Sequence, residues 1–345
     1  MSVETESPNG VLEDLRINFL ECWEKLPNKG LFFVLVAAWA ALFQWLGNST
    51  LGYVHSPSLF RFVLDNCHPD LAGWLTTLNF DAISGWMSEA EEAHVLLVPL
   101  VVAGLFWWRR KGLIEAPLRL WAPAFALLVA AAVLHVFGYM VQQPKASELG
   151  FILGLYALMG LAWGPEFLRR AAFPFFLLIF CIPLGTVVLP ITFRLRLLVC
   201  WLVEWVCNNL LMIDVRREGT ALINTPHQYA YEVAAACSGI RSLITTLLLA
   251  VVVGFVDFKT WWRRGVMVAS AFPLAVLGNL LRMLAIIIAT ELGGKEWGKY
   301  VHDGGPGGLL SLLPYVPPIF GLVWLGGRMR EGSPPASPAT QLKPA

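Results

Sequence analysis

Residues 265–290 read GVMVASAFPLAVLGNLLRMLAIIIAT, a run of 26 residues in which Arg282 is the single charged side chain. About 20 consecutive apolar residues are enough to cross the hydrocarbon core of a bilayer as a helix. The run is therefore predicted to be a transmembrane helix that contains a guanidinium. Such a charge is unfavourable in lipid unless it is paired or hydrated, so it marks a candidate functional position.

The rest of the chain has the same apolar character. Of its 345 residues, 57% are hydrophobic and 14% are charged, and the mean hydropathy is +0.63. Soluble domains carry about 25% charged residues, so we predict an all-α, polytopic transmembrane helical bundle that contacts membrane lipids. The net charge of +1 provides no basic field for nucleic acid. Further apolar runs lie at about 31–47, 93–108, 121–142, 149–164, 171–193, 238–256 and 309–326.

Five basic clusters set the predicted orientation, because Lys and Arg near span ends favour the cytoplasmic side. They are Lys25 with Lys29, Arg109 to Lys111, Arg169 with Arg170, Lys259 with Arg263 and Arg264, and Arg328 with Arg330. About eight crossings with both termini inside place all five in the cytoplasm. A ninth crossing by the apolar stretch 197–213 would expose Arg263 and Arg264. That stretch is therefore expected to lie at the interface or to re-enter rather than to cross.

The outer segments in this topology are 48–92, 143–148, 194–237 and 291–308. Within the third, residues 214–236 are polar and rich in strand-forming side chains. They predict a small β-hairpin around Asn224-Thr225-Pro226.

Three segments divide the chain. Residues 11–26 place Leu12, Leu15, Phe19 and Leu26 at helical spacing, which predicts an amphipathic helix on the membrane surface. The first apolar run follows Lys25 and Lys29 without the pattern of a cleavable signal peptide, so it is predicted to remain as an anchor. We expect a cytoplasmic amphipathic segment at 1–30, a membrane-embedded domain at 31–326 and a disordered cytoplasmic tail at 327–345.

Candidate chemistry begins with Cys237 in the stretch ACSGIRSL (236–243), which opens the sixth span at its outer end. Cys237 and Arg241 are four residues apart and share one helix face. The amino end of a helix and a nearby arginine both stabilise a thiolate. Cys237 is therefore a candidate nucleophile, with Ser238 and Arg241 as supporting or substrate-binding residues.

Two further polar positions fall on the same predicted side of the membrane. Arg282 lies in the outer half of its span, and Asn279 precedes it by one helical turn. His302 lies in the outer loop 291–308, before the turn DGGPGG (303–308), and can exchange protons near neutral pH. A thiol, a proton carrier and a fixed cation are the parts of a cysteine acyl-transfer site. We expect Cys237 to attack a peptide carbonyl, His302 to transfer the proton and Arg282 to hold the thiolate or the oxyanion, with Asn279 in support.

Structural roles compete with this interpretation. A single Cys at a membrane boundary is commonly structural, Arg241 could extend to the outer headgroups, and Arg282 could form an ion pair with Glu204 or Glu291. No CxxC and no Cys/His spacing typical of zinc is present, so neither a metal nor a cofactor is expected. No GxSxG, HExxH or P-loop pattern occurs, which leaves serine hydrolases, zincins and P-loop enzymes without support.

Over roughly residues 90–326 the chain resembles the exosortase/archaeosortase family of membrane transpeptidases. The resemblance lies in ACSGIRSL (236–243), GNLLRM (278–283), His302 before its Gly-rich turn, and AHVLLVPLVVAGLFWWRRKGL (93–113). It implies that Cys237, Arg282 and His302 are the active residues. It also implies that the substrates are secreted proteins ending in a short motif, a transmembrane helix and a basic cluster. Cleavage would occur on the outer, periplasmic face of the cytoplasmic membrane, with transfer of the new C-terminus to an acceptor, in systems often associated with exopolysaccharide.

The sequence also departs from that family. Ala93-His94-Val95 stands where many members carry a Ser-His-Gly-like sequence, so no role is predicted for His94. Two other functions remain open from the residues alone. A transporter or channel could use Arg282 and Arg241 to bind an anionic solute, and a non-catalytic scaffold could serve a polysaccharide export complex.

Overall fold

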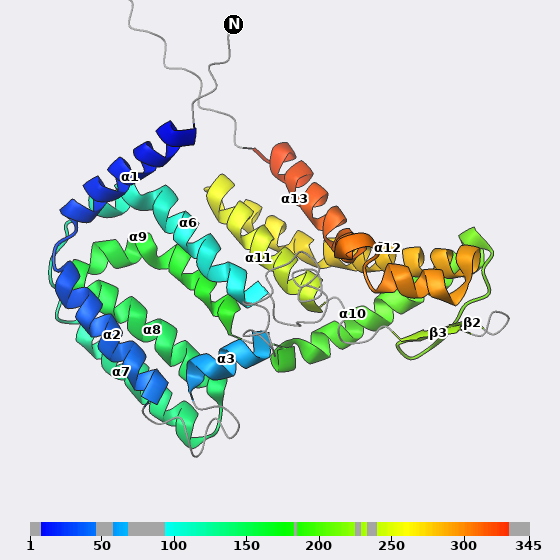
Figure 1. Cartoon of the computed structure of the whole chain (residues 1–345), viewed down its shortest axis with the longest axis horizontal. Coiled ribbons are helices and arrows are strands. Elements are labelled where there is room, and N and C mark those ends of the chain that lie inside the picture. Colours follow the sequence, from blue (N-terminus) through cyan, green and yellow to red (C-terminus); the bar gives the residue numbers. More distant parts are fainter. Residues whose placement is uncertain are drawn as a thin grey trace, which may run out of the picture. The chain divides into compact units, whose positions relative to one another are not determined.

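The computed structural model describes residues 8–45, 58–67, 94–182, 185–224, 229–232 and 240–330. Within these ranges the chain is mainly helical with one small sheet, which fits an all-α membrane protein (Figure 1). It divides into two compact units. Unit 1 comprises Met1–Leu78 and Ala90–Thr186, and unit 2 comprises Asn79–Glu89 and Val187–Ala345.

Unit 1 contains the helices of the first half of the chain. They are α1 (Pro8–Lys25), α2 (Lys29–Trp45), α3 (Leu59–Cys67), α6 (His94–Ile114), α7 (Ala124–Met140), α8 (Pro144–Trp163), α9 (Pro165–Phe176) and the 3₁₀ helix η1 (Leu177–Cys181). One buried cluster joins α2, α3, α7 and α8 around Phe43 and Leu158. A second joins α6, α8 and α9 around Trp163 and Ala171.

Glycines bring α7 and α8 into close contact. A Cβ atom at Gly150 would lie 2.9 Å from the backbone oxygen of Ala131, and one at Gly138 would lie 2.8 Å from the backbone nitrogen of Ser147. Membrane helices associate through such small residues, because lipid provides little hydrophobic drive between them. Helix α7 also exposes Phe125, Val129, Val133, Val136 and Phe137, an apolar surface suited to lipid.

The predicted amphipathic helix at 11–26 corresponds to α1. The part of α1 from Arg16 to Lys25 meets α2 at an angle of 92°. The indole of Trp163 donates a hydrogen bond to the backbone oxygen of Pro27 at 2.9 Å, and Nδ2 of Asn28 donates to that of Ala162 at 3.3 Å. The bend is therefore held against the C-terminal end of α8.

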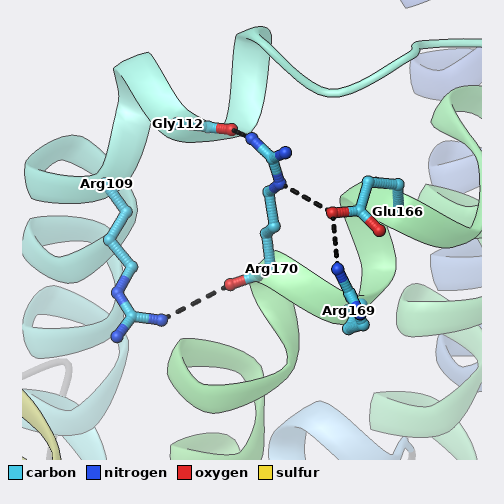
Figure 2. Close-up of polar contacts among 5 residues, drawn as sticks. All are labelled: Arg109, Gly112, Glu166, Arg169 and Arg170. Carbon is cyan, nitrogen blue, oxygen red and sulfur yellow. Dashed lines mark hydrogen bonds and ion pairs between the residues drawn. The ribbon is translucent and has the colours of Figure 1, made fainter. Parts of the chain in front are cut away.

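Two of the predicted cytoplasmic clusters meet in unit 1, as Figure 2 shows. Nη1 of Arg109 on α6 donates to the backbone oxygen of Arg170 on α9 at 3.5 Å, and Nη1 of Arg170 donates to the backbone oxygen of Gly112. Glu166 accepts hydrogen bonds from Arg170 and Arg169, each at 3.0 Å. These two guanidiniums, with Arg170 making the larger contribution, hold the pKa of the Glu166 carboxyl below its ordinary value. The clusters thus share one end of unit 1, as the topology requires. Their side of the membrane stays a prediction.

The predicted span 171–193 is not one continuous helix. Helix α9 ends at Phe176, η1 covers Leu177–Cys181, and a new helix, α10, runs from Gly185 to Val206. Ile182 takes an extended conformation with ψ 125°. The following residue is Pro183, and a proline disfavours helical geometry at the residue before it. The apolar run alone did not reveal this break.

Unit 2 holds the second half of the chain. After α10 come the π-helical turn η2 (Cys207–Leu211), β1 (Arg216–Glu218), β2 (Ala221–Asn224), β3 (Tyr229–Glu232), α11 (Ile240–Asp257), α12 (Trp261–His302), the 3₁₀ helix η3 (Pro306–Tyr315) and α13 (Val316–Arg328). One buried cluster joins α10, the sheet and the middle of α12 around Val203, Leu222 and Ile286. Another joins α11, α12 and α13 around Ala250, Met267 and Leu322.

The sheet is antiparallel in the order β1-β2-β3. Arg216 pairs with Ile223, and Leu222 pairs with Tyr231. Strands β2 and β3 correspond to the two arms of the predicted hairpin, whose turn at 225–228 lies outside the described residues. Strand β1 was not predicted from the sequence.

The stretch 197–213 forms the second half of α10 and η2. Its buried residues Val199, Val203 and Cys207 pack against Met283 and Ile287 of α12, which lie C-terminal to Arg282 on that helix. Trp201 and Trp205 on the same stretch are exposed, and tryptophan favours the membrane–water boundary. These contacts agree with an interfacial segment, and its relation to the membrane stays a prediction.

Among the described residues, α8 and α12 are each long and apolar enough to cross a membrane, and the bent pair α1–α2 would make a third. Helix α7 and Ser242–Asp257 of α11 are apolar but shorter. The total of about eight crossings stays a prediction.

Candidate functional site

Helix α12 reverses direction near its C-terminal end. Gly294 has φ 77° and ψ −177°, a conformation outside the helical region that separates 261–293 from 295–302. A Cβ atom at Gly298 would overlap Oγ1 of Thr290 and Oη of Tyr231. Nη2 of Arg282 donates to the backbone oxygen of His302 at 3.4 Å. Because 298 lies against 290 and 302 lies near 282, the second segment runs back along the first.

Within the predicted outer segment 291–308, residues 291–302 are helical apart from Gly294, a conformation that the sequence did not predict. Residues 304–308 comprise four glycines and one proline, and they follow the end of the returning helix.

Arg282 is half-buried and lies next to this returning segment. Its Nε is buried and has no hydrogen-bond partner among the residues that the structure describes. Arg282 follows Arg264 by 18 residues, which is about 27 Å along a helix. The hydrocarbon core is about 30 Å thick. If Arg264 lies at the inner boundary, as the topology predicts, Arg282 lies near the outer one.

The alternative ion pairs of Arg282 are not formed. Glu204 accepts from the backbone nitrogen of Arg217 at 3.0 Å and forms an ion pair with its guanidinium at 3.5 Å. Glu291 accepts from Oη of Tyr229 at 2.7 Å and from Nδ2 of Asn224 at 3.2 Å. Within the described part of the chain, neither carboxylate is paired with Arg282.

His302 ends the returning helix beside an acidic neighbour. Its Nδ1 lies 3.1 Å from Oδ1 of Asp303. A carboxylate that accepts a hydrogen bond from Nδ1 favours the imidazole tautomer with its proton on that nitrogen. Asp303 was not predicted to be a site residue, although it directly follows a candidate base in the sequence.

A glycine cap terminates the helix immediately after His302. The backbone nitrogen of Gly305 donates to the oxygen of Tyr300 at 2.8 Å, and that of Gly304 donates to the oxygen of Val301 at 3.2 Å. Gly304 has φ 100°, as expected for a Schellman motif with glycine just past the helix end. The Gly-rich turn therefore fixes the place where the helix stops, and with it the position of His302.

Asn279 and Gly278 lie on α12 just before Arg282. Asn279 is buried, which suits the predicted supporting role without testing it. A Cβ atom at Gly278 would overlap the backbone oxygen of Pro314 in η3. Gly278 therefore lets the backbone of η3 approach α12 one turn from the guanidinium.

Replacing Gly278 with Ala should lower the unfolding free energy by about 1–3 kcal/mol, because the new methyl group meets a backbone atom that cannot move independently. The matched control is Gly265→Ala on the same helix, where an added Cβ meets nothing within 4 Å and should be neutral or stabilising. Thermal unfolding in detergent compares the two. Equal melting temperatures for both variants would contradict the close packing of η3 on α12.

Along the axis of α12, the N-terminus of α11 lies at the same height as the helical turn that contains Arg282. A Cβ atom at Gly254 would lie 3.5 Å from Cβ of Met267 and 3.7 Å from Cα of Arg264. Helices α11 and α12 are antiparallel neighbours joined by a short turn. With about 1.5 Å of rise per residue in both helices, the start of α11 at Ile240 corresponds to residues 278–281 of α12.

The other predicted site residues are incompletely described. Cys237 and Ser238 lie outside the described residues, in the segment 233–239 between β3 and α11. Arg241 belongs to the first turn of α11. The structure thus brings the backbone of His302 to the Arg282 guanidinium, with Asn279 one helical turn away on α12, and the roles of all six residues stay predictions. No group of three His, Cys, Asp or Glu side chains among the described residues could hold a metal ion.

Comparison with known proteins gives one family. A family model described as transmembrane exosortase matches residues 86–320, which is more than half of the chain. No curated protein and no solved structure matches.

Proposed function

Because the chain belongs to the transmembrane exosortase family, we propose that it is a membrane-embedded cysteine protease and transpeptidase. Its substrates are secreted proteins that end in a short motif, a transmembrane helix and a basic cluster. Cleavage takes place at the outer face of the cytoplasmic membrane, and the new C-terminus passes to an acceptor.

In the proposed reaction, His302 takes the proton of Cys237 and the thiolate attacks the carbonyl carbon of the scissile peptide. Arg282 stabilises the resulting oxyanion. The C–N bond then breaks, and His302 gives its proton to the leaving amine, which leaves a thioester on Cys237. An acceptor nucleophile, deprotonated by His302, attacks the thioester and releases the thiol. Asp303 orients the imidazole, and Ser238, Arg241 and Asn279 assist binding.

One observation supports this proposal most strongly. The reversal at Gly294 returns His302 to Arg282, at the level where α11 begins. Cys237 precedes Ile240 by three residues, and three residues of extended chain span about 10 Å at most. A thiol on this short connection can therefore lie near the Arg282 guanidinium.

The arrangement does not favour transport. In transporters built from repeats, binding residues gather near the bilayer midplane. Arg282 is instead near the outer end of its predicted span, beside a returning helix. A non-catalytic scaffold would also not require the half-buried guanidinium of Arg282 next to the backbone of His302.

The test is to co-express the protein with a candidate substrate from the same genome that ends in motif, apolar helix and basic cluster. Mass spectrometry then determines the new C-terminus of the product. We expect the processed substrate to lack its transmembrane helix and basic cluster and to carry the additional mass of the acceptor. A product whose new C-terminus is a free carboxyl would support the protease activity and contradict the transpeptidase activity. A substrate that stays intact, with the protein correctly inserted, would contradict both.

A further inference from the structure

We infer that Glu291 is a positioning residue, which fixes β3, the strand that precedes Cys237 in the sequence, on α12. The inference deepens the proposed function and rests on it, because it concerns the placement of the proposed nucleophile. Glu291 lies nine residues beyond Arg282 on α12, about 13 Å farther along the helix. It is therefore too distant to act on the substrate carbonyl beside Arg282 and can act only through other residues.

A single carboxylate oxygen of Glu291 holds two strands. Its Oε1 accepts from Oη of Tyr229 on β3 at 2.7 Å and from Nδ2 of Asn224 on β2 at 3.2 Å. Both donors are buried, with relative exposures of 5% for Tyr229 and 2% for Asn224. Hydrogen bonds from buried donors to a carboxylate are stronger than neutral ones, and loss of the acceptor removes one such bond from each of the two strands.

A second contact holds β3 two residues farther along. Oη of Tyr231 lies 2.7 Å from Oγ1 of Thr290, which is buried and itself donates to the backbone oxygen of Ile286 at 2.8 Å. Gly298 on the returning helix leaves space for this pair, because a Cβ atom there would overlap both hydroxyl oxygens. Alternate residues of β3 are thus attached to adjacent residues of α12.

These contacts define both ends of the connection that contains Cys237. Strand β3 ends at Glu232 and α11 begins at Ile240. The first end is attached to α12 at 290–291, and the second lies level with 278–281 of the same helix. The candidate nucleophile therefore belongs to a short segment between a strand and a helix that are both positioned against α12, the helix that carries Arg282. Small displacements of reacting groups can reduce a rate by about 10²-fold, so release of the β3 end should impair the chemical step.

The environment of Tyr229 agrees with a persistent contact. Burial and the adjacent Glu291 carboxylate raise the pKa of the phenol above its ordinary value. The phenol therefore stays protonated, as a hydrogen-bond donor must, at pH values where an ordinary tyrosine ionises.

The experiment measures kcat and KM, normalised to the amount of protein with an unmodified Cys237. It also measures the rate at which iodoacetamide alkylates Cys237, which peptide mass spectrometry distinguishes from the other cysteines. Glu291→Leu removes the acceptor and should lower kcat about 10–100-fold with a small change in KM. Tyr229→Phe deletes one hydrogen bond and should lower kcat about 3–10-fold. Glu291→Gln retains an acceptor oxygen and should stay within about threefold of the wild type. In the first two variants the alkylation rate of Cys237 should change as well.

Glu296→Leu is the matched control, because Glu296 is an exposed glutamate on the returning part of the same helix. It should leave kcat and alkylation unchanged. A loss in Glu291→Leu that merely follows the amount of folded protein would overturn the inference. If Glu291→Leu does not fold, Tyr229→Phe tests the inference instead. Full kcat and an unchanged alkylation rate in Tyr229→Phe would also overturn the inference. The proposed function fails separately, if substrate processing survives replacement of Cys237 itself.

Discussion

Replacing Cys237 with Ala or Ser is expected to abolish processing of a co-expressed substrate while insertion and folding are preserved. Without the thiol no thioester forms, and a serine hydroxyl at this position lacks the acidity that makes a thiolate accessible near neutral pH. The processed fraction should fall by about 10³-fold or more. Immunoblotting of the substrate measures the loss, and thermal unfolding of the purified variants verifies their fold.

A second cysteine provides the control for this prediction. Cys22 is a half-buried free thiol on α1, far in sequence from the proposed site, and Cys22→Ala should process substrate normally. Wild-type processing by Cys237→Ala would end the assignment of the nucleophile. Equal losses in both variants would point to a general effect of cysteine replacement.

Arg282→Lys is expected to lower kcat by about 10²–10³-fold, although it preserves a positive charge. Loss of one preorganised donor to an oxyanion has an effect of this size. A lysine ammonium is a compact point charge and cannot reproduce the planar fork of the guanidinium. It would also lose the geometry that reaches the backbone oxygen of His302 at 3.4 Å. Steady-state kinetics with a purified substrate measures the change.

Arg328→Lys is the matched control, because Arg328 stacks over Trp324, 5.5 Å from the ring centroid, at the end of α13. It should retain full activity. The pH dependence of Cys237 alkylation in Arg282→Gln separates two roles: a raised thiol pKa means that Arg282 holds the thiolate, and an unchanged one means that it holds the oxyanion. Full activity in Arg282→Lys would remove Arg282 from the mechanism.

The sequence predicted helices well where one physical signal dominated. Apolar length and the position of Arg282 identified α12, and helical spacing identified α1. The positive-inside rule placed Arg109 and Arg170 on one side, and the structure joins them through a backbone contact. In each case the signal lies within a few neighbouring residues, so no knowledge of the tertiary fold was needed.

Features that depend on the tertiary fold were not predicted. The break between α9 and α10 was missed as well, although Pro183 in the apolar run is a local signal for it. The return of α12 depends on the positive φ of Gly294 and on the space left by Gly298, and a glycine in a sequence indicates neither. Glu291 was considered as a partner for Arg282, but it binds Tyr229 and Asn224, which are more than 60 residues away in the chain.

The central claim is that the thiol of Cys237 and the imidazole of His302 share one pocket beside Arg282. Cross-linking tests it directly: Cys237 is paired with His302→Cys in a protein whose other five cysteines are replaced, and mild oxidation or a short bismaleimide is applied. Gly254→Cys with Met267→Cys is the positive control, because their Cβ atoms would lie 3.5 Å apart, within disulfide range. We predict that Cys237 cross-links to position 302 and not to Lys259→Cys at the opposite end of α11. Absence of the 237–302 cross-link while the control pair reacts, or a cross-link to position 259, would contradict the account.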